Sequence, residues 1–541
     1  MSDPVRDLAS AVAEASSSLR GDNGAARLPV LERPPKPDFG DYSTNAALLL
    51  APALGEQPRA VAERLGAVLE DRLGPQVEKV DVAGPGFLNL FMSETWARTG
   101  VAGALASGDA YGAGDGGERT NVEFVSANPT GPLTVASARH AAYGDSLCRI
   151  LEFAGNDVER EYYVNDHGSQ IERFAASIRA RAQGEDPPED GYQGEYVTEL
   201  AARIEGAASL DDDALAEQGV AIMLEQVKAS LERFRVHMDR FTHESHNHGS
   251  GAVAAALEEL DARGHVYTHE DAVWLRTTGF GDDKDRVLQR GGGEATYFAS
   301  DIAYHADKLR RGYDRVIDVL GADHHGYVDR VKVAWEALGG QPDRFEVLIM
   351  QLVNLMEGGR RAQMSKRAGA IVTLDELITD IGVDATRWFL VQRSHDTALD
   401  LDLDLARRQS QDNPVYYAQY AHARIASILR KAGDERVEAA LEADLAGGDA
   451  ALHPSERALV KGLLELPGEV RHAAERRAPH RMTTYVTETA QAFSAFYRDC
   501  KVVGAAEEGG DEDLRIALCE ATRRVIARGL DLLGVQAPQS M

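Results

Sequence analysis

Hydrophobic and polar positions divide the chain into two parts of different character. Before about Leu405, short apolar runs that suit strands alternate with longer runs of helical periodicity. After that point the strand runs disappear and helical periodicity continues to the end. Strands that alternate with helices are typical of an α/β domain, and helices alone are typical of a bundle. The pattern therefore predicts an α/β body followed by a helical bundle at 406–541.

The N-terminal residues 1–95 have a pattern of their own. Alanine and leucine dominate 46–51 and 58–73, which predicts helices. The segments 77–83 and 87–91 alternate between apolar and polar residues on either side of a Gly-Pro-Gly turn, which predicts two half-buried strands. We expect a small α/β domain ahead of the main one.

The main α/β domain is expected at 118–405. A strand at 121–126, a proline- and glycine-rich loop and an alanine-rich helix at 135–154 form the first half of a βαβ unit. Later runs at 315–321 and 345–353 are predicted as buried strands. The segment at about 165–290 is largely helical and acidic, and it has the character of an insertion.

Composition and charge limit the class of protein. Of the 541 residues, 44% are hydrophobic and 27% charged, which excludes a disordered chain, and the length suggests about three domains. Acidic residues outnumber basic ones by 87 to 58, and the net charge of −29 means that a nucleic acid would have to meet a local basic face. Three scattered cysteines fit a reducing compartment. Neither a signal peptide nor a membrane-spanning run is apparent, so we expect a cytoplasmic protein away from membranes.

The loop 126–137 and the helix behind it are the first candidate for chemistry. A helix N-terminus carries unpaired N–H groups and a partial positive charge, so it can hold a phosphate. An ordinary turn between strand and helix explains this segment alone equally well.

The second candidate is a basic loop rich in glycine. Ser365, Lys366 and Arg367 lie between Gly359 and Gly369. A loop of this kind can close over a polyphosphate and neutralise the charge of a leaving group. The alternative is a solvated basic turn.

Together the two candidates belong to a series of motifs that resembles the arginyl-tRNA synthetases of class I. The series runs over nearly the whole chain: Val122-Glu-Phe-Val-Ser-Ala-Asn-Pro-Thr-Gly-Pro-Leu, Tyr162-Tyr-Val-Asn-Asp-His-Gly, Phe280-Gly-Asp-Asp-Lys-Asp-Arg-Val-Leu, Thr296-Tyr-Phe-Ala-Ser-Asp-Ile-Ala-Tyr-His, Gly321-Ala-Asp-His-His-Gly-Tyr, Met364-Ser-Lys-Arg-Ala-Gly and Asp412-Asn-Pro-Val-Tyr-Tyr-Ala-Gln-Tyr-Ala-His-Ala-Arg. The resemblance implies an α/β class I Rossmann-type catalytic domain with an insertion, an N-terminal domain that contacts the tRNA elbow, and an all-α bundle that binds the anticodon.

One motif departs from the family. Its first signature is His-aliphatic-Gly-His, or a variant ending in Gly-Gly, but this chain has Thr134-Val-Ala-Ser137. Hydroxyl groups donate weaker hydrogen bonds to phosphates than imidazolium does. Ala136 adds a methyl group where the adenine would lie. Gln363 also replaces the usual first lysine of the second signature, whereas Lys366 is kept.

The resemblance implies an arginine–tRNA ligase that uses ATP, with Mg²⁺ bound to the nucleotide, to join L-arginine to tRNA(Arg) through arginyl-adenylate. A monomer is expected. Two alternatives stay open. The altered signature fits a catalytically weakened paralogue that binds tRNA or arginine as a regulator, and an enzyme that adenylates arginine for another acceptor is also conceivable, although it would not need an anticodon-binding bundle.

The family pattern also implies roles for individual residues. The catalytic residues are Lys366, Ser365, Thr134 and Ser137; the ATP-binding residues are Asn128, Pro129, Gly131, Pro132, Ala136, His324, Met364 and Lys366. The arginine-binding residues are Glu123, Ser126, Asn128, Tyr297, Asp301 and Asp323; the tRNA-binding residues are Phe87, Asn89, Tyr416, Tyr420 and Arg424.

Some of these residues have a plainer interpretation. Tyr297 and Asp301 are four apart, as in any pair on one face of a surface helix. The tyrosines at 416, 417 and 420 could stack on unpaired bases or pack inside the bundle. A basic stretch from Arg471 to Arg481 is another candidate for contact with nucleic acid. The two histidine clusters lack the spacing of a zinc site, so no metal site is expected.

Overall fold

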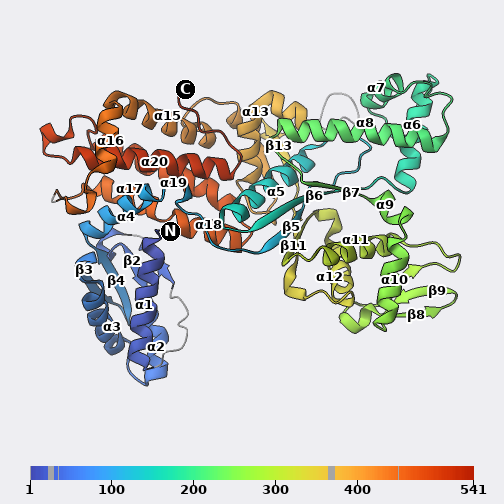
Figure 1. Ribbon diagram of the computed structural model, residues 1–541. Helices are drawn as coiled ribbons and strands as arrows, with labels where there is room; N and C mark the ends of the chain where they lie inside the picture. Colours follow the sequence, from blue (N-terminus) through green and yellow to red (C-terminus); the bar gives the residue numbers. More distant parts are fainter. Residues whose placement is uncertain (1, 22–29, 35, 363–371, 449) are drawn as a thin grey trace.

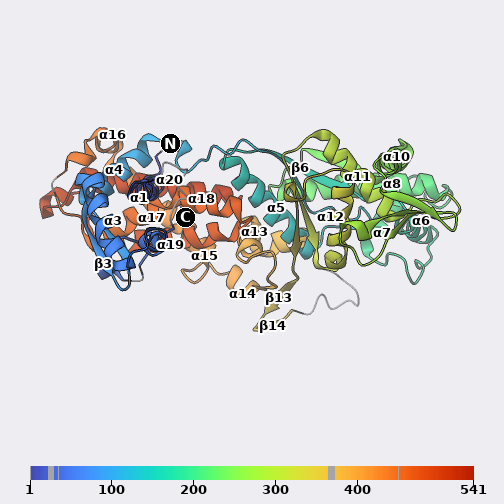
Figure 2. The same cartoon turned by 90° about the horizontal axis from the view of Figure 1, so that it is seen from below.

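The computed structural model describes residues 2–21, 30–34, 36–362, 372–448 and 450–541. The molecule is elongated (Figures 1 and 2). The helical bundle occupies one end and the central α/β domain the other, and the N-terminal domain projects from the bundle. Both chain ends lie at the bundle (Figure 1).

In the N-terminal domain, helices pack against a four-stranded antiparallel sheet of order β1-β2-β4-β3. Leu88, Leu90 and Met92 of β4 are fully buried, as the alternation of this segment predicts. The elements are α1 (Pro4–Arg20), β1 (Leu31–Glu32), β2 (Tyr42–Thr44), α2 (Ala46–Leu54), α3 (Pro58–Leu73), β3 (Val77–Ala83) and β4 (Phe87–Met92). The following helix, α4 (Glu94–Ala106), packs on the bundle instead.

The central domain is built on a parallel sheet of five strands in the order β12-β11-β5-β6-β7. Counted in chain order from β7, this is the 3-2-1-4-5 arrangement of a Rossmann-type fold, in which the order of the parallel strands switches direction between β5 and β11. The strands are β5 (Arg119–Glu123), β6 (Asp157–Val164), β7 (Arg240–His243), β11 (Arg315–Gly321) and β12 (Phe345–Met350), and the covering helices are α5 (Val135–Phe153), α11 (Tyr297–Arg311) and α12 (Val328–Ala337).

Helix α5 lies unusually close to the sheet because of one glycine. A Cβ atom on Gly144 would lie 2.2 Å from Cγ of Phe124, which follows β5. Only glycine therefore permits this contact, which joins the middle of α5 to the segment that follows β5.

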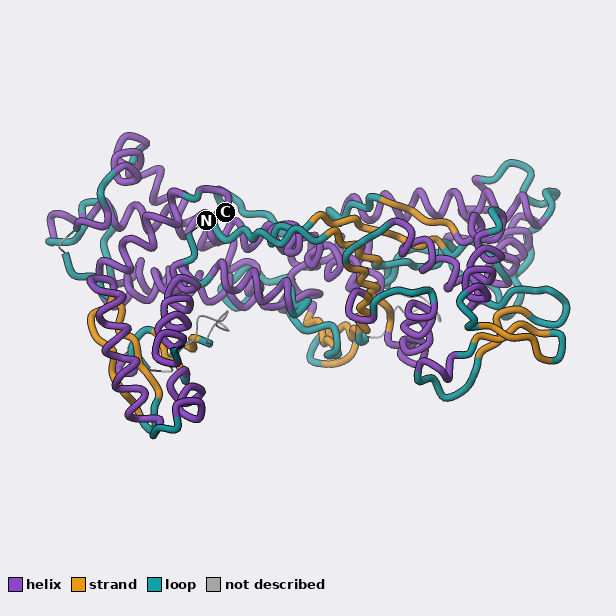
Figure 3. Tube along the Cα trace, turned by 60° about the horizontal axis from the view of Figure 1, so that its bottom comes forward, coloured by secondary structure: helices purple, strands orange, loops and turns teal. Residues whose placement is uncertain are grey.

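The segment between β6 and α11 contributes three separate parts. A helical hairpin extends from the sheet, then β7 joins the sheet, and a small three-stranded sheet lies at the far end of the molecule (Figure 3). The elements are α6 (Ser169–Ala182), α7 (Glu195–Arg203), α8 (Asp212–Arg233), α9 (Glu244–Gly249), α10 (Ala252–Ala262), β8 (Val266–His269), β9 (Ala272–Leu275) and β10 (Arg286–Gln289).

The run 345–353, predicted as one strand, is two strands in different sheets. The strand β12 ends at Met350, and β13 (Val353–Glu357) pairs with β14 (Arg360–Arg361) and β15 (Leu399–Asp402). Gln351 and Leu352 join them, and Leu352 is 64% exposed. Hydrophobicity alone does not reveal where a chain leaves one sheet for another. Helices α13 (Leu374–Val391) and α14 (Leu403–Ala406) flank β15 in the chain.

In the C-terminal bundle, the helical periodicity from Ser455 to Arg476 predicts a single helix, but the structure has two. The helix breaks at Glu465, because Pro467 has no N–H and cannot continue the ladder of hydrogen bonds. The hydroxyl of Tyr111 donates to the Leu463 carbonyl instead, at 3.1 Å. The helices are α15 (Pro414–Ala432), α16 (Asp434–Glu442), α17 (Pro454–Leu464), α18 (Leu466–Glu475), α19 (His480–Asp499) and α20 (Glu512–Leu532).

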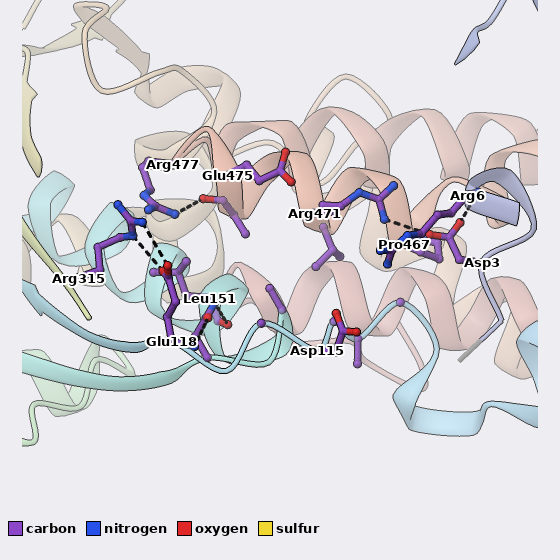
Figure 4. A pocket seen from close by; sticks show the side chains of 18 of the residues that line it. Asp3, Arg6, Asp115, Glu118, Leu151, Arg315, Pro467, Arg471, Glu475 and Arg477 are labelled. Atoms are coloured by element: carbon purple, nitrogen blue, oxygen red, sulfur yellow. Dashed lines mark hydrogen bonds and ion pairs between the residues drawn. The ribbon is translucent and has the colours of Figure 1, made fainter. Parts of the chain in front are cut away.

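The basic stretch from Arg471 to Arg481 lies largely at the junction of the three domains (Figure 4). Arg471 pairs with Asp3 at 3.0 Å, and Arg477 forms a two-pronged pair with Glu346 of β12 at 2.8 and 2.9 Å. Arg481 pairs with Glu469. The proposal that this stretch contacts nucleic acid is therefore weakened, because most of its guanidinium groups join parts of the protein.

Candidate active site

A cavity of about 530 Å³ opens at the carboxyl ends of the parallel strands, where the strand order reverses between β5 and β11. Its walls come from the segment after β5, the first turns of α5, the end of β6, α11, the segment after β11 and the link between β12 and β13. Ligands of open α/β sheets bind at this place in the fold. In the larger cavity of about 610 Å³ at the domain junction, most of the charged side chains pair with one another: Arg315 with Glu118 and Glu346, Arg477 with Glu346, and Arg471 with Asp3 (Figure 4).

The backbone after β5 is strained at the cavity wall. Val125 and Ser126 have φ values of 69° and 39°, in the left-handed region that L-residues seldom adopt. Such strain gathers at functional sites. The Ser126 hydroxyl donates to Glu123 at 2.9 Å and accepts from the Tyr163 N–H at 3.1 Å, so two hydrogen bonds fix its position.

Beneath the cavity lies a buried ionic cluster. The Lys308 ammonium donates to Glu123 at 2.6 Å and to Asp318 at 2.7 Å, and His305 Nε2 lies 3.0 Å from Asp318. Burial opposes the charge of Asp318, but Lys308 and His305 more than offset it and hold the pKa of Asp318 below its usual range. The ammonium of Lys308 thus offsets the negative charge of Glu123. The cluster forms a rigid floor of the cavity in which positive and negative charges nearly balance.

Asp301 supplies less fully balanced negative charge. Its carboxylate accepts a hydrogen bond from the Tyr327 hydroxyl, and burial raises its pKa to about 6. The buried carboxyl of Glu244 lies behind it, and burial together with Asp301 and Asp166 raises the pKa of Glu244 to about 7. A cation that entered here would stabilise both ionised carboxylates and lower both pKa values.

The altered signature segment forms the start of α5. The Thr134 side chain caps the helix by accepting from the Ser137 N–H at 3.3 Å, and the two hydroxyls lie 3.3 Å apart. Ala136 and Ser137 line the cavity, whereas Thr134 does not. The cap leaves less of the Thr134 hydroxyl for a ligand.

The segment that follows residues 363–371 is tied to this helix start. The Val135 N–H donates to the Val372 carbonyl at 3.2 Å, and the Leu374 N–H donates to the Leu133 carbonyl at 2.8 Å. The start of α13 and the start of α5 are therefore held side by side at the cavity.

Arg139 secures the opposite wall. Its fully buried guanidinium donates to four backbone carbonyls, those of Gln351, Leu352, Ser394 and Thr397, at 2.7 to 3.4 Å. Burial lowers its pKa to about 10. Because Gln351 and Leu352 line the cavity, Arg139 fixes the shape of that wall.

Comparisons with known proteins bear on what this cavity does. Three family models match: the arginyl tRNA synthetase N terminal domain at 6–92, the catalytic domain of class I (R) tRNA synthetases at 212–426, and the DALR anticodon binding domain at 418–541. A curated arginine–tRNA ligase of Frankia alni is 48% identical over 526 residues, which cover 94% of each chain. The chain belongs to the arginyl-tRNA synthetase family.

Solved structures agree with this assignment. Arginyl-tRNA synthetase of Thermus thermophilus is 26% identical with a TM-score of 0.78 and covers 99% of this chain and 100% of its own. The enzyme of Plasmodium falciparum, at 16% identity and a TM-score of 0.76 over 100% of both chains, shows the shared fold. The predictions of fold class, family and ligase activity are confirmed, and nothing found favours the alternative of a regulator without activity.

The cavity of this synthetase brings together half of the predicted catalytic, ATP-binding and arginine-binding residues. Those that line it are Glu123, Ser126, Asn128, Ala136, Ser137, Asp301, Asp323 and His324. Pro129, Gly131 and Pro132 belong to the loop above, where the Tyr196 hydroxyl donates to the Thr130 carbonyl. Tyr297 is 65% exposed at the start of α11, with its hydroxyl beside Gly168. Met364, Ser365 and Lys366 lie outside the described residues.

The predicted tRNA residues do not line the cavity and lie in the other two domains, on β4 and α15. On the bundle, the rings of Tyr416 and Tyr420 stack at 6.3 Å, and the Arg424 guanidinium lies over Tyr420 and over Tyr497 of α19. Tyr417 points inward and donates to Ser494 at 2.8 Å, so one of the three tyrosines does pack within the bundle. Phe87 is 39% exposed on β4, whereas Asn89 is buried.

Sequence reasoning missed several residues of the site. Glu244 and Tyr327 surround Asp301, and Lys308 pairs with Glu123. Glu244 and Lys308 belong to none of the motifs, whereas Tyr327 ends the motif at 321–327 but had no predicted role. His140 also lines the cavity, and its place one turn beyond the signature was the only available sign. Within the described residues, no group of three or more His, Cys, Asp or Glu side chains could hold a metal ion, and no helix there could cross a membrane.

Proposed function

We propose that this cavity activates arginine with ATP and passes the arginyl group to tRNA(Arg). The proposal is carried by one observation: the carboxylate of Asp301 and the N-terminus of α5 face the same cavity at the reversal of strand order. A carboxylate suits a guanidinium, and a helix N-terminus suits a phosphate. One site thus fits both substrates of the ligase.

The arginine side chain points toward Asp301 in this proposal. The guanidinium donates to the Asp301 carboxylate, with the Glu244 charge behind it and the Tyr327 hydroxyl holding Asp301 in place. Because Lys308 offsets the charge of Glu123, the floor of the cavity does not hold a second cation too tightly. Asn128, Ser126 and Asp323 are near enough to the same cavity to receive the amino-acid backbone.

The nucleotide lies against the first turns of α5. The apolar lining residues Ala136, Leu320, Met350 and Leu352 suit the adenine ring, and Leu352 is held by the Arg139 clamp. The phosphates face the N–H groups of the helix start, and His324 offers a further donor from the segment after β11. Lys366 acts on the phosphates from the loop whose later flank, at Val372, is bound to α5.

The reaction follows in two steps. A carboxylate oxygen of arginine bonds to the α-phosphorus, the bond to the bridging oxygen of the β-phosphate breaks, and pyrophosphate leaves with that electron pair. A ribose hydroxyl at the 3′ end of the tRNA then attacks the carbonyl carbon, and AMP leaves. The protein contributes chiefly by positioning the reactants and stabilising the developing charge.

Mg²⁺ enters with the triphosphate in this proposal and supplies positive charge on its phosphates. The phosphate oxygens of ATP suit this role, because Mg²⁺ prefers oxygen ligands and commonly takes them from the nucleotide and water. The expectations of a monomer and of a cytoplasmic location stay predictions.

The test is a charging assay with purified protein, tRNA(Arg) transcript, labelled arginine, ATP and Mg²⁺. We expect arginyl-tRNA to form and Asp301→Asn to abolish it, since the amide cannot balance the guanidinium charge. Pyrophosphate exchange is measured with and without tRNA in parallel. Tight tRNA binding without charging would contradict the proposal in favour of a regulator, and adenylate without arginyl-tRNA would favour another acceptor.

A further inference from the structure

His140 stands one helical turn beyond the altered signature, on the same face of α5. Residues three and four apart on a helix are neighbours, so His140 follows Ser137 and Ala136 along one stripe. All three line the cavity. Arg139, next in sequence, points in another direction, where its guanidinium is buried among carbonyls.

The imidazole of His140 has no hydrogen-bond partner among the described residues, and it is half-buried at the cavity wall. The ring lies beside the segment that follows β11: a methyl group placed on Gly321 would be 3.9 Å from its Cε1 atom. His324 and Asp323 come from that same segment and line the same cavity. A polar ring with free nitrogens at a ligand cavity has hydrogen-bonding capacity that the protein does not use.

The hydroxyls that replace the signature histidines are, in contrast, partly engaged. Thr134 caps α5 and does not line the cavity, and the Ser137 hydroxyl lies 3.3 Å from the Thr134 hydroxyl. On this stretch of α5, His140 is therefore the cavity-lining donor that no hydrogen bond within the described residues engages.

The surroundings of His140 determine the protonation state in which it acts. Burial and then the Arg139 charge lower its pKa to about 4; Asp323 opposes this shift, and His324 adds a smaller lowering effect. At neutral pH the free ring is uncharged, with one N–H donor and one acceptor. The charge of a bound triphosphate would raise this pKa, because a nearby anion favours imidazolium.

We propose that His140 donates a hydrogen bond to a phosphate oxygen of ATP and so does the work that the family assigns to the histidines of its first signature. The inference rests on the proposed function. It accounts for a signature without histidine in a chain otherwise close to active ligases. His140 contacts the nucleotide and stabilises the charge that develops as pyrophosphate leaves.

The kinetic test compares His140→Ala, His140→Phe and His140→Gln with the wild type in arginine-dependent pyrophosphate exchange with tRNA present. Loss of one such donor costs ~10²-fold in turnover, and we expect that loss for Ala and Phe. The KM for arginine should change less than twofold. Glutamine keeps an N–H donor, so it should recover part of the activity, which a purely steric role would not produce. His237→Ala is the matched control, because that side chain is 77% exposed and lies outside the cavity.

A spectroscopic test is independent of turnover. In the full-length protein, the Cε1–H signal of His140, assigned by its loss in His140→Phe, should report a pKa well below that of free histidine. Addition of a nonhydrolysable ATP analogue should raise that pKa, and addition of arginine alone should not.

The outcomes separate this proposal from the proposed function. If the wild type is active and His140→Phe matches it, or if the analogue binds and leaves the His140 signal unchanged, the assignment of His140 is wrong and the ligase stands. If the wild type neither binds the analogue nor forms adenylate, both proposals fall together.

Discussion

Consecutive residues at the start of α5 serve different purposes. Thr134 closes the helix end, Arg139 is buried and holds four carbonyls, and His140 faces the cavity with free nitrogens. A turn of 3.6 residues separates these directions, so a single segment shapes the helix, the wall and the ligand contact at once. The side-chain chemistry at each position follows from the face on which it lies.

Arg139 gives the first prediction at this scale. Arg139→Met should leave buried carbonyls without donors, at a cost of about 3 kcal/mol in the local stability of the wall. The Gln351 N–H donates to His395 at 2.8 Å, so its exchange with solvent reports opening of this wall. Hydrogen exchange at Gln351 should accelerate about a hundredfold, the rate equivalent of that cost. Arg139→Lys keeps some hydrogen-bond donors and should accelerate exchange less. Unchanged exchange in Arg139→Met would show that the hydrogen bonds of Arg139 do not hold this wall in place.

Asp301 gives a prediction about pH. Its pKa of about 6 in the free protein means that the carboxyl takes up a proton as the pH falls through 6, and a neutral carboxyl attracts a guanidinium weakly. Burial raises this pKa, so the ionised form required for arginine is present above about pH 6 and is lost below it. Arginine affinity, measured by calorimetry, should fall about tenfold from pH 7 to pH 5.

The control is Asp301→Asn, which should bind arginine weakly at every pH. Glu244, Glu123 and His324 also face this region, and the residual slope of the variant measures their share. An affinity of the wild type that is flat from pH 7 to pH 5 would show that Asp301 does not bind the guanidinium.

Sequence could predict the residues of this site better than their partners. The motif pattern identified Asp301, Ser126 and Ala136, which do line the cavity. It could not identify Lys308 or Glu244, because a buried ion pair depends on which helices the fold brings together and leaves no local pattern. Thr134 is the opposite case: the family motif implied a catalytic role for it, and in the structure its side chain caps α5.

At the scale of elements, the limits of prediction lie where chain segments change partners. The strand at 315–321 was predicted with its observed bounds, because a buried parallel strand reads as one apolar run. The run 345–353 was wrongly predicted as one strand, and the helix at 455–476 did not allow for Pro467. Neither error displaces a domain, but the first concealed the exposed Leu352 that lines the cavity.

The pair between β12 and the α18–α19 connection links the catalytic sheet to the bundle. Arg477 reaches Glu346 with two hydrogen bonds, and the Tyr143 hydroxyl of α5 donates to the Arg477 carbonyl at 2.5 Å. Arg477→Met should loosen the docking of the bundle by about 1 kcal/mol and lower kcat/KM for tRNA about fivefold. Binding of ATP and arginine should not change, because Glu346 lies near the amino end of β12 and neither residue of the pair lines the cavity at the carboxyl ends.

A double-mutant cycle with Glu346→Gln tests this coupling in the charging assay. The double variant should be no slower than the slower single variant, since both remove the same pair. Arg476→Met is the matched control, as that exposed neighbour has no ion-pair partner among the described residues. Additive losses would show that the two residues act separately.

At the scale of the whole molecule, the acidic charge and the elongated shape have to be reconciled with a tRNA partner. The net charge of −29 repels a polyanion at long range, so affinity must come from local contacts. The stacked Tyr416, Tyr420 and Arg424 belong to α15 of the bundle, whereas the cavity belongs to the α/β domain; Figure 1 shows the two domains side by side along the elongated molecule. A ligand that contacts both has to span two domains, which fits a tRNA.

Tyr420 tests this surface. Tyr420→Ala should weaken tRNA binding by about 1–3 kcal/mol, the usual value of one base stacked on an aromatic ring. Filter binding at fixed salt measures the change, and the KM values for ATP and arginine should stay the same. Tyr417→Phe removes only the inward hydroxyl bond to Ser494 and should leave tRNA affinity unchanged. Equal losses in the two variants would indicate damage to the bundle and contradict a stacking role for Tyr420.

The proposed reaction requires that ATP binds beside α5 although the signature there lacks histidine. Calorimetry with a nonhydrolysable ATP analogue, in the presence of arginine and tRNA(Arg), measures this directly. We predict saturable binding at one site in the wild type, and loss of that binding in Ala136→Trp, whose indole would fill the space of the adenine beside the exposed Ala136. Absence of binding in the wild type, or equal binding in Ala136→Trp, would contradict the placement of ATP and with it the central claim.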